Sequence, residues 1–236
     1  MTDPRSPSRP GQGPQVAASE AQRWAHTARF VTTASRLDQL PVGELPEIAF
    51  VGRSNAGKST AINTLTQRRR LAFASRTPGR TQHINLFALG PKDRPDAWFA
   101  DLPGYGYAAV EREAKLRWQQ VMADYLAVRR NLAGIVLLVD ARLGLTDLDR
   151  RLLDFVARRV TTGEVRLLVL LTKCDKLARR AAAASLRTVS HALESMASED
   201  ADIGVTLFSA LKHTGVGDVT ATLRAWVRGA SATGQG

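Results

Sequence analysis

Short apolar segments of strand length alternate with amphipathic segments of helix length through most of the chain. An unbroken apolar run such as residues 134–140 predicts a buried strand, whereas apolar residues at three- and four-residue spacing, as in 147–159, predict a helix with one buried face. The same pattern predicts strands over residues 47–51, 83–89, 97–101, 134–140, 165–172 and 205–209, and helices over 58–67, 111–130, 147–159, 179–196 and 219–227. Alternation of this kind is typical of an α/β fold with a mostly parallel six-stranded sheet and helices on both faces.

The two ends of the chain lack this pattern. Residues 1–22 are rich in Pro, Ser, Gly and Gln without periodicity, which predicts a disordered tail. Residues 229–236 are small and polar, and we expect them to form a second loose tail. The sequence therefore predicts a single domain over residues 23–228.

The first predicted strand is followed by the pattern G-x-x-x-x-G-K-S. In parallel sheets, ligands bind at the carboxyl ends of the strands, where this segment lies. Its glycines allow backbone N–H groups to point at phosphate oxygens, and the next helix directs its positive dipole end to the same place. Lys58 should reach the β- and γ-phosphates, and Ser59 should ligate Mg²⁺. This P-loop predicts a P-loop NTPase fold, and its residues are Gly52, Arg53, Ser54, Asn55, Ala56, Gly57, Lys58 and Ser59.

A second motif, Asp101, Leu102, Pro103 and Gly104, directly follows the strand 97–101. It resembles the D-x-x-G motif of GTPases, in which the Asp holds Mg²⁺ directly or through a water molecule. The N–H of Gly104 could bind the γ-phosphate and so sense hydrolysis. We therefore interpret Lys58, Asp101 and Gly104 as catalytic residues.

GTPases also need a segment between these two motifs with a Thr that closes on Mg²⁺ in the GTP state. Thr81 is the candidate because of its Gly-Arg-Thr context, and Thr77 is the alternative. Thr81 then counts as both a catalytic residue and a metal ligand, beside Ser59. The nucleotide-contacting residues predicted in this segment are Gly79, Arg80, Thr81, Gln82 and His83.

The base-reading residues follow the last two predicted strands. A carboxylate at Asp175 can accept hydrogen bonds from N1–H and the 2-amino group of guanine, and adenine offers no such pair of donors. The stem of Lys173 would pack on the base plane. The later segment resembles the S-A-K loop, whose backbone N–H contacts guanine O6. Together the two segments comprise Thr172, Lys173, Cys174, Asp175, Phe208, Ser209 and Ala210.

Two residues bear on the rate of hydrolysis. Small GTPases usually place a Gln directly after D-x-x-G to orient the attacking water, but this chain has Tyr105 there. Intrinsic hydrolysis should therefore be slow, and Gln82 is only a minor candidate as a substitute. Asn55 could bind K⁺ beside the phosphates, where the cation would act as an arginine finger does, or it could simply stabilise the loop.

The chain carries 33 Lys and Arg against 22 Asp and Glu, a formal net charge of +11. Such a surplus favours a polyanionic partner such as nucleic acid, although it could also serve solubility. The basic residues around the Thr81 segment would couple RNA contact to the nucleotide state if this segment orders with GTP. They are Arg68, Arg69, Arg70, Arg76 and Arg80.

Other features concern the compartment. The single cysteine, Cys174, excludes an internal disulfide. Apolar runs such as residues 167–171 are too short to span a bilayer, and the first residues lack the apolar region of a signal peptide. We therefore expect a cytoplasmic protein.

The combined motifs resemble the EngB family of GTPases. The resemblance extends over about residues 30–228 and rests on residues 30–34, 52–59, 77–82, 101–107, 172–175 and 208–210. Thr172, where generic GTPases have Asn, is normal for that family, and Cys174 stands where Ala is commoner. The resemblance implies a bacterial cytoplasmic GTPase that binds GTP and GDP with Mg²⁺. It also implies a monomer without membrane contact that helps to assemble the large ribosomal subunit, contacts rRNA and ribosomal proteins, and is needed for normal cell division and septation.

Three alternatives remain open from the sequence. A tRNA-modification-type GTPase module also carries Asn in its P-loop, but such modules come with further domains, for which we expect no room here. An RNA-binding scaffold that uses GTP only structurally would show RNA affinity independent of the nucleotide. An ATP-using protein is the weakest alternative, because Asp175 favours guanine.

Overall fold

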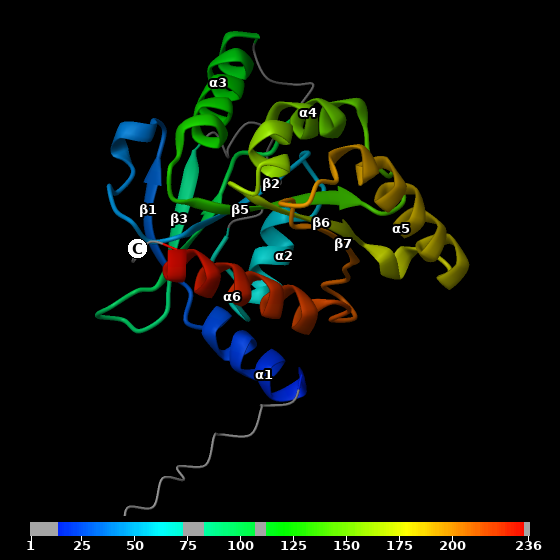
Figure 1. Cartoon of the computed structure of the whole chain (residues 1–236), viewed down its shortest axis with the longest axis horizontal. Helices are drawn as coiled ribbons and strands as arrows, with labels where there is room; N and C mark the ends of the chain where they lie inside the picture. Colours follow the sequence, from blue (N-terminus) through cyan, green and yellow to red (C-terminus); the bar gives the residue numbers. More distant parts are fainter. Residues whose placement is uncertain (1–13, 73–82, 107–111, 234–236) are drawn as a thin grey trace, which may run out of the picture.

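A twisted seven-stranded sheet forms the centre of the computed structural model, which describes residues 14–72, 83–106 and 112–233 (Figure 1). The strand order is β1-β3-β4-β2-β5-β6-β7. The strands are β1 (Arg29–Ala34), β2 (Glu47–Gly52), β3 (Ile84–Leu89), β4 (Ala97–Asp101), β5 (Leu132–Asp140), β6 (Arg166–Thr172) and β7 (Ile203–Leu207).

All six predicted strands are present, and the mostly parallel arrangement is confirmed. β2 pairs in parallel with β4 and β5, and β6 pairs in parallel with β5 and β7. The predicted count of six is wrong, because β1 adds a seventh strand antiparallel to β3, which is itself antiparallel to β4. At this edge of the sheet only Ala34 of β1 is buried, so the strand lacks the apolar run by which the others were predicted.

Helices cover both faces of the sheet (Figure 1). One hydrophobic cluster joins the sheet to α1, α2 and α6, and the other joins it to α3, α4 and α5. Among the described residues, no helix is long and apolar enough to cross a membrane. The helices are α1 (Pro14–Ala25), α2 (Lys58–Leu65), α3 (Arg112–Val128), α4 (Asp147–Thr161), α5 (Arg179–Leu193) and α6 (Val216–Thr233).

The structure corrects the predicted tails. Residues Pro14–Ala25 form α1, although a disordered tail was predicted up to residue 22, and α6 continues to Thr233, beyond the predicted boundary at 229. α1 packs against α6, and its Trp24 is buried and donates a hydrogen bond to Asp96 Oδ1 at 2.8 Å. Contacts with distant segments therefore stabilise a helix that the composition of the tail does not indicate.

Candidate nucleotide-binding site

The predicted P-loop lies between β2 and α2, at the carboxyl edge of the parallel strands. Gly52 ends β2 where the neighbouring strand leaves no space: a Cβ atom there would stand 2.7 Å from the carbonyl oxygen of Leu138. Asn55 and Gly57 have φ values of 66° and 92°, in the left-handed region that glycine adopts most easily. The loop thus turns sharply and leads into the amino end of α2 at Lys58.

Lys58 and Asp101 meet beneath the P-loop as a buried ion pair between Nζ and Oδ1. Lys58 is 8 % exposed and Asp101 is fully buried. The second carboxylate oxygen of Asp101, Oδ2, is buried and has no hydrogen-bond partner among the described residues. A buried carboxylate oxygen of this kind fits a water molecule held by Mg²⁺, and Ser59 follows Lys58 in the first turn of α2.

The D-x-x-G segment packs directly on the P-loop. Tyr105 N donates to Gly52 O at 3.2 Å, and Ser54 N donates to Tyr105 O at 2.8 Å. A Cβ atom on Gly104 would approach the Ser54 nitrogen to 3.3 Å, closer than side chains usually tolerate. The two phosphate-binding segments are therefore in backbone contact, and only a glycine fits between them without a shift.

The side chain of Tyr105 points away from this site into the core beneath α4. Its hydroxyl donates to Asp149 Oδ1 at 2.6 Å, and the ring is 3 % exposed. Burial raises the pKa of Tyr105 well above its usual range, and the nearby Asp149 carboxylate raises it further. Asp149 itself is held by Thr146, whose N and Oγ1 donate to Oδ2 at 2.8 and 2.6 Å. Tyr105 therefore has a packing role.

The base-reading segment is tied to the P-loop by two side chains. Thr172 Oγ1 donates to Ala56 O at 2.7 Å, and Lys173 Nζ donates to Asn55 O at 2.7 Å. Thr172 is buried, whereas Lys173 is partly exposed and has a left-handed φ of 57°. The hydroxyl of Thr172 thus joins the base-reading and phosphate-binding loops, although GTPases usually have Asn at this position.

Asp175 lies at the outer end of the same segment. Its Oδ1 accepts a hydrogen bond from Ser209 Oγ at 2.6 Å, which holds the pKa of the Asp175 carboxyl below its usual value. Cys174 N donates to Phe208 O at 3.3 Å, so the two predicted guanine segments are side by side. They border a cavity of about 210 Å³ lined by Gly57, Thr60, Thr172, Lys173, Asp175, Lys176, Phe208, Ala210 and Leu211.

Asp140, at the end of β5, is a site residue that the sequence analysis missed. It accepts hydrogen bonds from Arg142 Nε at 2.9 Å and from Lys173 Nζ at 2.9 Å. Arg142 chiefly, with Lys173, holds the pKa of the Asp140 carboxyl well below its usual range. The signal that could have revealed it is its place at the carboxyl end of an apolar strand, where ligands of parallel sheets gather.

Some predicted residues have other surroundings. Leu102 is buried in the core, and so is Cys174, the pKa of whose thiol is raised by burial. Any contact of these two residues with the nucleotide would therefore come from the backbone. His83 is exposed at the bend before β3. The predictions for Arg76, Thr77, Gly79, Arg80, Thr81 and Gln82 concern residues outside the described ranges.

The P-loop is backed by the buried Lys58–Asp101 pair, and the cavity beside it is bordered by the Asp175 carboxylate. These features define a P-loop nucleotide-binding protein of the GTPase class. The family model described as "50S ribosome-binding GTPase" matches residues 47–173. The chain is 60 % identical over 203 residues to "Probable GTP-binding protein EngB" of Acidovorax ebreus, covering 86 % of this chain and 89 % of the relative. It is 56 % identical to the protein of the same name from a Polaromonas species, covering 94 % of this chain and 88 % of the relative. The chain belongs to the EngB family of GTP-binding proteins.

Solved structures support the fold. A crystal structure of a probable GTP-binding protein engB covers 77 % of this chain and 98 % of its own length, with a TM-score of 0.59 and 20 % identity. Era, crystallised with MgGDPNP and nucleotides of 16S ribosomal RNA, covers 78 % of this chain and 57 % of its own, with a TM-score of 0.61 and 19 % identity. At these identities the likeness concerns the fold alone.

Proposed function

We propose that this chain is a GTP-driven switch that acts in the assembly of the large ribosomal subunit. The observation that carries the proposal is the cavity between the P-loop and Asp175, in a chain that belongs to a family of ribosome-binding GTPases. The protein would work as a cytoplasmic monomer that contacts rRNA and ribosomal proteins. The role in cell division and septation implied by the family resemblance would follow from this activity.

The nucleotide would lie across the cavity, with guanine at Asp175 and the phosphates at the P-loop. Asp175 would accept the two guanine donors, and its contact with Ser209 supports this role by orienting the carboxylate before the base arrives. Lys58 would turn from Asp101 toward the β- and γ-phosphates, and the N–H of Gly104 would contact the γ-phosphate. Only GTP would therefore contact the D-x-x-G segment through a γ-phosphate, and GDP would lack this contact.

Mg²⁺ is the metal that this site would take. Ser59 and Thr81 would hold it, with Asp101 Oδ2 on one of its water ligands, and the unpartnered buried oxygen of Asp101 supports this assignment. The ion would neutralise charge on the β- and γ-phosphates. Among the described residues no group of three or more His, Cys, Asp or Glu could hold a metal, which is consistent with hydroxyl and phosphate ligands.

Hydrolysis without a partner would be slow. Tyr105, which occupies the position of the usual water-orienting Gln, has its hydroxyl bound to Asp149 and cannot serve as that residue. Removing a group that orients the water or neutralises charge in the transition state typically lowers the hydrolysis rate by factors of about 10³ or more. A partner would therefore have to accelerate hydrolysis by about this factor.

Asn55 would bind K⁺ beside the phosphates. Its backbone carbonyl is held by Lys173, but its exposed side chain makes no hydrogen bond with another described residue. That observation supports a ligand role for the amide. The cation would then place positive charge where an arginine finger would otherwise act.

Co-sedimentation with purified large ribosomal subunits tests the proposal, in GDP and in a non-hydrolysable GTP analogue, each at two salt concentrations. We expect stronger binding with the analogue and a loss of binding at the higher salt concentration. Equal binding in both nucleotide states would favour the scaffold function instead. Absence of binding in both states would refute the ribosomal part of the proposal and leave GTP binding as the remaining function.

A further inference from the structure

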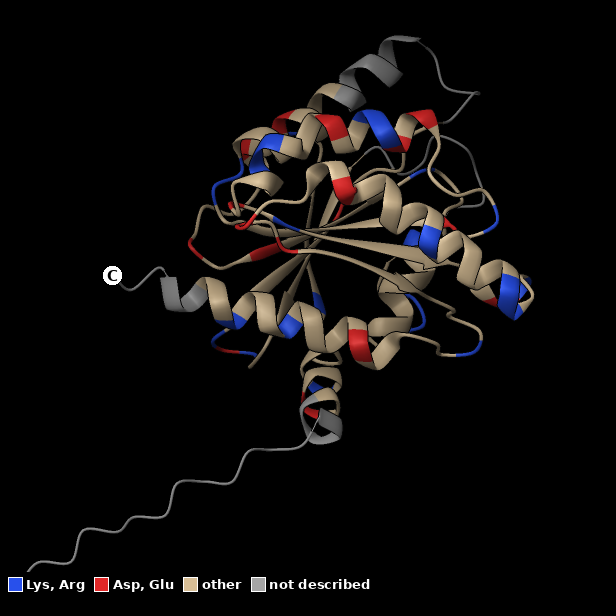
Figure 2. Ribbon diagram, turned by 45° about the vertical axis from the view of Figure 1, so that its right-hand side comes forward, with Lys and Arg blue, Asp and Glu red and all other residues tan. Residues whose placement is uncertain are grey.

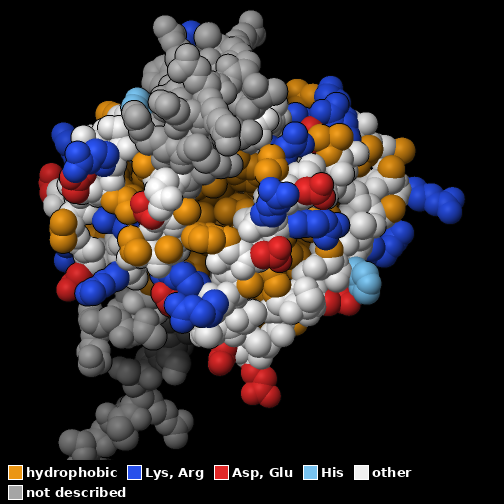
Figure 3. All heavy atoms as spheres, turned by 90° about the horizontal axis from the view of Figure 1, so that it is seen from above, with side chains coloured by type: hydrophobic (Ala, Val, Ile, Leu, Met, Phe, Trp, Pro, Cys, Tyr) orange, Lys and Arg blue, Asp and Glu red, His pale blue; other side chains and the backbone are white. Residues whose placement is uncertain are grey.

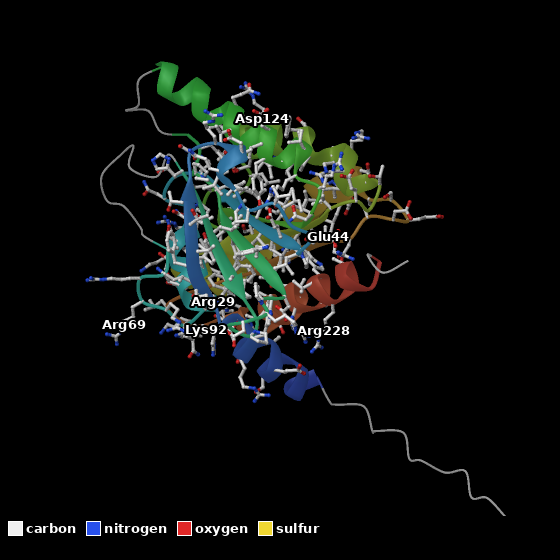
Figure 4. All side chains as sticks on the ribbon, turned by 90° about the vertical axis from the view of Figure 1, so that its left-hand side faces the viewer. Arg29, Glu44, Arg69, Lys92, Asp124 and Arg228 are labelled. Atoms are coloured by element: carbon white, nitrogen blue, oxygen red, sulfur yellow. The ribbon has the colours of Figure 1, made fainter. Side chains whose placement is uncertain are left out.

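Three segments that are distant in sequence lie side by side at one end of the molecule. Arg29, at the start of β1, donates to Gly90 O at 3.0 Å and to Lys92 O at 3.1 Å, and so joins β1 to the β3–β4 hairpin. Arg68, just after α2, donates to His26 O at 3.4 Å in the turn before β1. Figure 4 shows Arg29, Arg69 and Lys92 at the same end, with Glu44 and Asp124 away from it.

These segments carry a concentration of positive charge, which we name the basic surface. None of its side chains forms an ion pair with another described residue. Of the two acids in the hairpin, Asp96 is neutralised by Arg224 at 2.8 Å, which leaves Asp93. The basic surface consists of Arg29, Arg68, Arg69, Arg70, Lys92 and Arg94.

Charge elsewhere in the described residues is more mixed. Basic and acidic residues alternate along α4, with Asp147 and Asp149 in its first turn and Arg158 and Arg159 in its last turn (Figure 2). On the face that includes α3 and α4, hydrophobic side chains gather in the middle of the surface (Figure 3). The basic surface differs from both because it is neither balanced in charge nor apolar.

Its composition fits the phosphate backbone of RNA better than a protein. Protein interfaces have an apolar centre, whereas nucleic-acid interfaces are polar and strongly positive. Of the large apolar side chains exposed in the described residues, Phe30 and Val31 follow Arg29, and Phe30 contacts Phe87, whereas residues 68–70 and 90–96 contain none. We propose that the basic surface is an RNA phosphate-binding surface that contributes equally in both nucleotide states, while the stronger binding of large subunits in the GTP state comes from contacts elsewhere on the protein. This inference rests on the proposed ribosomal function and adds a location to it.

Independence from the nucleotide, in place of the coupling that the sequence predicts for Arg68, Arg69 and Arg70, is inferred from where the basic surface lies. β4 runs parallel to β2 and begins at Ala97, so the β3–β4 hairpin lies at the amino ends of these strands, opposite the P-loop. α2 starts in the P-loop at Lys58 and ends at Leu65, and its eight residues separate the P-loop from Arg68 by roughly 12 Å. RNA bound here would leave the nucleotide cavity open to exchange.

The hairpin is also fixed before RNA arrives. Gly90, with a φ of 87°, donates from its N–H to Thr27 Oγ1 at 2.8 Å, and Asp96 N donates to Leu89 O at 2.9 Å. With Arg29 bound to its carbonyl groups, the hairpin presents Lys92 and Arg94 without having to fold on binding. A preformed surface loses less conformational entropy when it binds.

The test uses the full chain with glutamine substitutions that remove charge but keep polarity. The surface variant combines R68Q, R69Q, R70Q, K92Q and R94Q and leaves Arg29, which holds the hairpin. A matched variant removes the same charge from exposed positions of α4 and α5, with R150Q, R151Q, R179Q, R180Q and R187Q. The affinity of each for GDP verifies folding, because none of these residues lines the nucleotide cavity.

The probes are a fluorescein-labelled RNA duplex, anionic phospholipid vesicles and purified large ribosomal subunits. We expect the surface variant alone to lose at least about tenfold in duplex affinity, equally in GDP and in a GTP analogue. Its slope of log affinity against log salt should become shallower by about 0.9 for each phosphate that the variant no longer neutralises.

Several results would overturn the inference. Unchanged duplex binding by the surface variant, or an equal loss in both variants, would show that the basic surface has no special role. A loss confined to the GTP-analogue state would refute nucleotide-independent anchoring, and a loss confined to the vesicles would assign the surface to membranes. If the wild-type chain fails to bind large subunits while the surface variant still loses duplex affinity, the proposed ribosomal function fails and the RNA surface stands.

Discussion

The hydroxyl of Thr172 provides the most direct test of how the base-reading and phosphate-binding loops are coupled. It donates to Ala56 O at 2.7 Å, and both residues are buried, at 3 % and 5 % exposure. Gly57 packs against the same side chain, since a Cβ atom there would lie 3.8 Å from Thr172 Cβ. Thr172→Val keeps the shape of the side chain and removes the donor.

The magnitude follows from the loss of the single hydroxyl proton, for which Ala56 O at 2.7 Å is the nearer acceptor and Val139 O at 3.1 Å the second. Leaving a buried acceptor without its donor costs about 1–3 kcal/mol, and the extra methyl group of Val offsets part of this. We therefore expect the free energy of unfolding to fall by about 1–2 kcal/mol. If the bond also holds the P-loop in its binding conformation, the dissociation constant for GDP should rise by up to about 5- to 30-fold.

Thr172→Ser is the matched control, because it keeps the hydroxyl and loses one methyl group. Its stability should also fall, by about 1 kcal/mol, so stability alone does not separate the two variants. Affinity for a fluorescent GDP analogue separates them: the Ser variant should bind as the wild type does, and the Val variant should bind more weakly. Equal affinity of the Val and Ser variants, with both folded, would refute the coupling of the two loops through Thr172.

Three further predictions concern base selection, the monovalent cation and pH. Asp175→Asn should weaken GTP binding at least about tenfold and shift the preference toward xanthine nucleotides, because the Asn amide can donate to the carbonyl that xanthine carries in place of the 2-amino group of guanine. Competition between GTP and XTP measures this preference. An unchanged preference would show that Asp175 does not select the base. GTP hydrolysis should be faster in K⁺ than in Na⁺ and lose this difference in Asn55→Ala, whereas equal wild-type rates in the two salts would exclude the cation site. Burial raises the pKa of Tyr105 and of Tyr125, next to Asp149 and Glu47 respectively, so the folded chain keeps both protons above pH 10, where the unfolded chain begins to lose them. The free energy of unfolding that these two tyrosines contribute should therefore be constant below about pH 10 and should fall above it, by up to about 1.4 kcal/mol per pH unit for each tyrosine. Urea unfolding at about pH 8 and about pH 11 measures this fall. An equal fall in a Tyr125→Phe variant would contradict the prediction.

The sequence by itself determined the order of strands and helices from residue 47 onward and most of the nucleotide site. The P-loop, Asp101, Thr172 and Asp175 each lie at the carboxyl end of a strand whose apolar run is evident from neighbouring residues. The carboxyl ends of parallel strands share one edge, so the motifs were expected to meet there, and the cavity joins Gly57 to Asp175. These features depend on local periodicity and on rules of βαβ connection, which the sequence carries directly.

Only the tertiary structure decided the features that join distant segments. β1 has a single buried residue and is a strand because it pairs with β3, and α1 is a helix that packs against α6. The ion pair of Asp140 with Lys173 spans 33 positions, and the bond of Tyr105 to Asp149 spans 44. The basic surface likewise exists because Arg29 and Arg68 bind carbonyl groups of other segments. Such contacts depend on how whole elements pack, and no pattern of neighbouring residues along the chain encodes them.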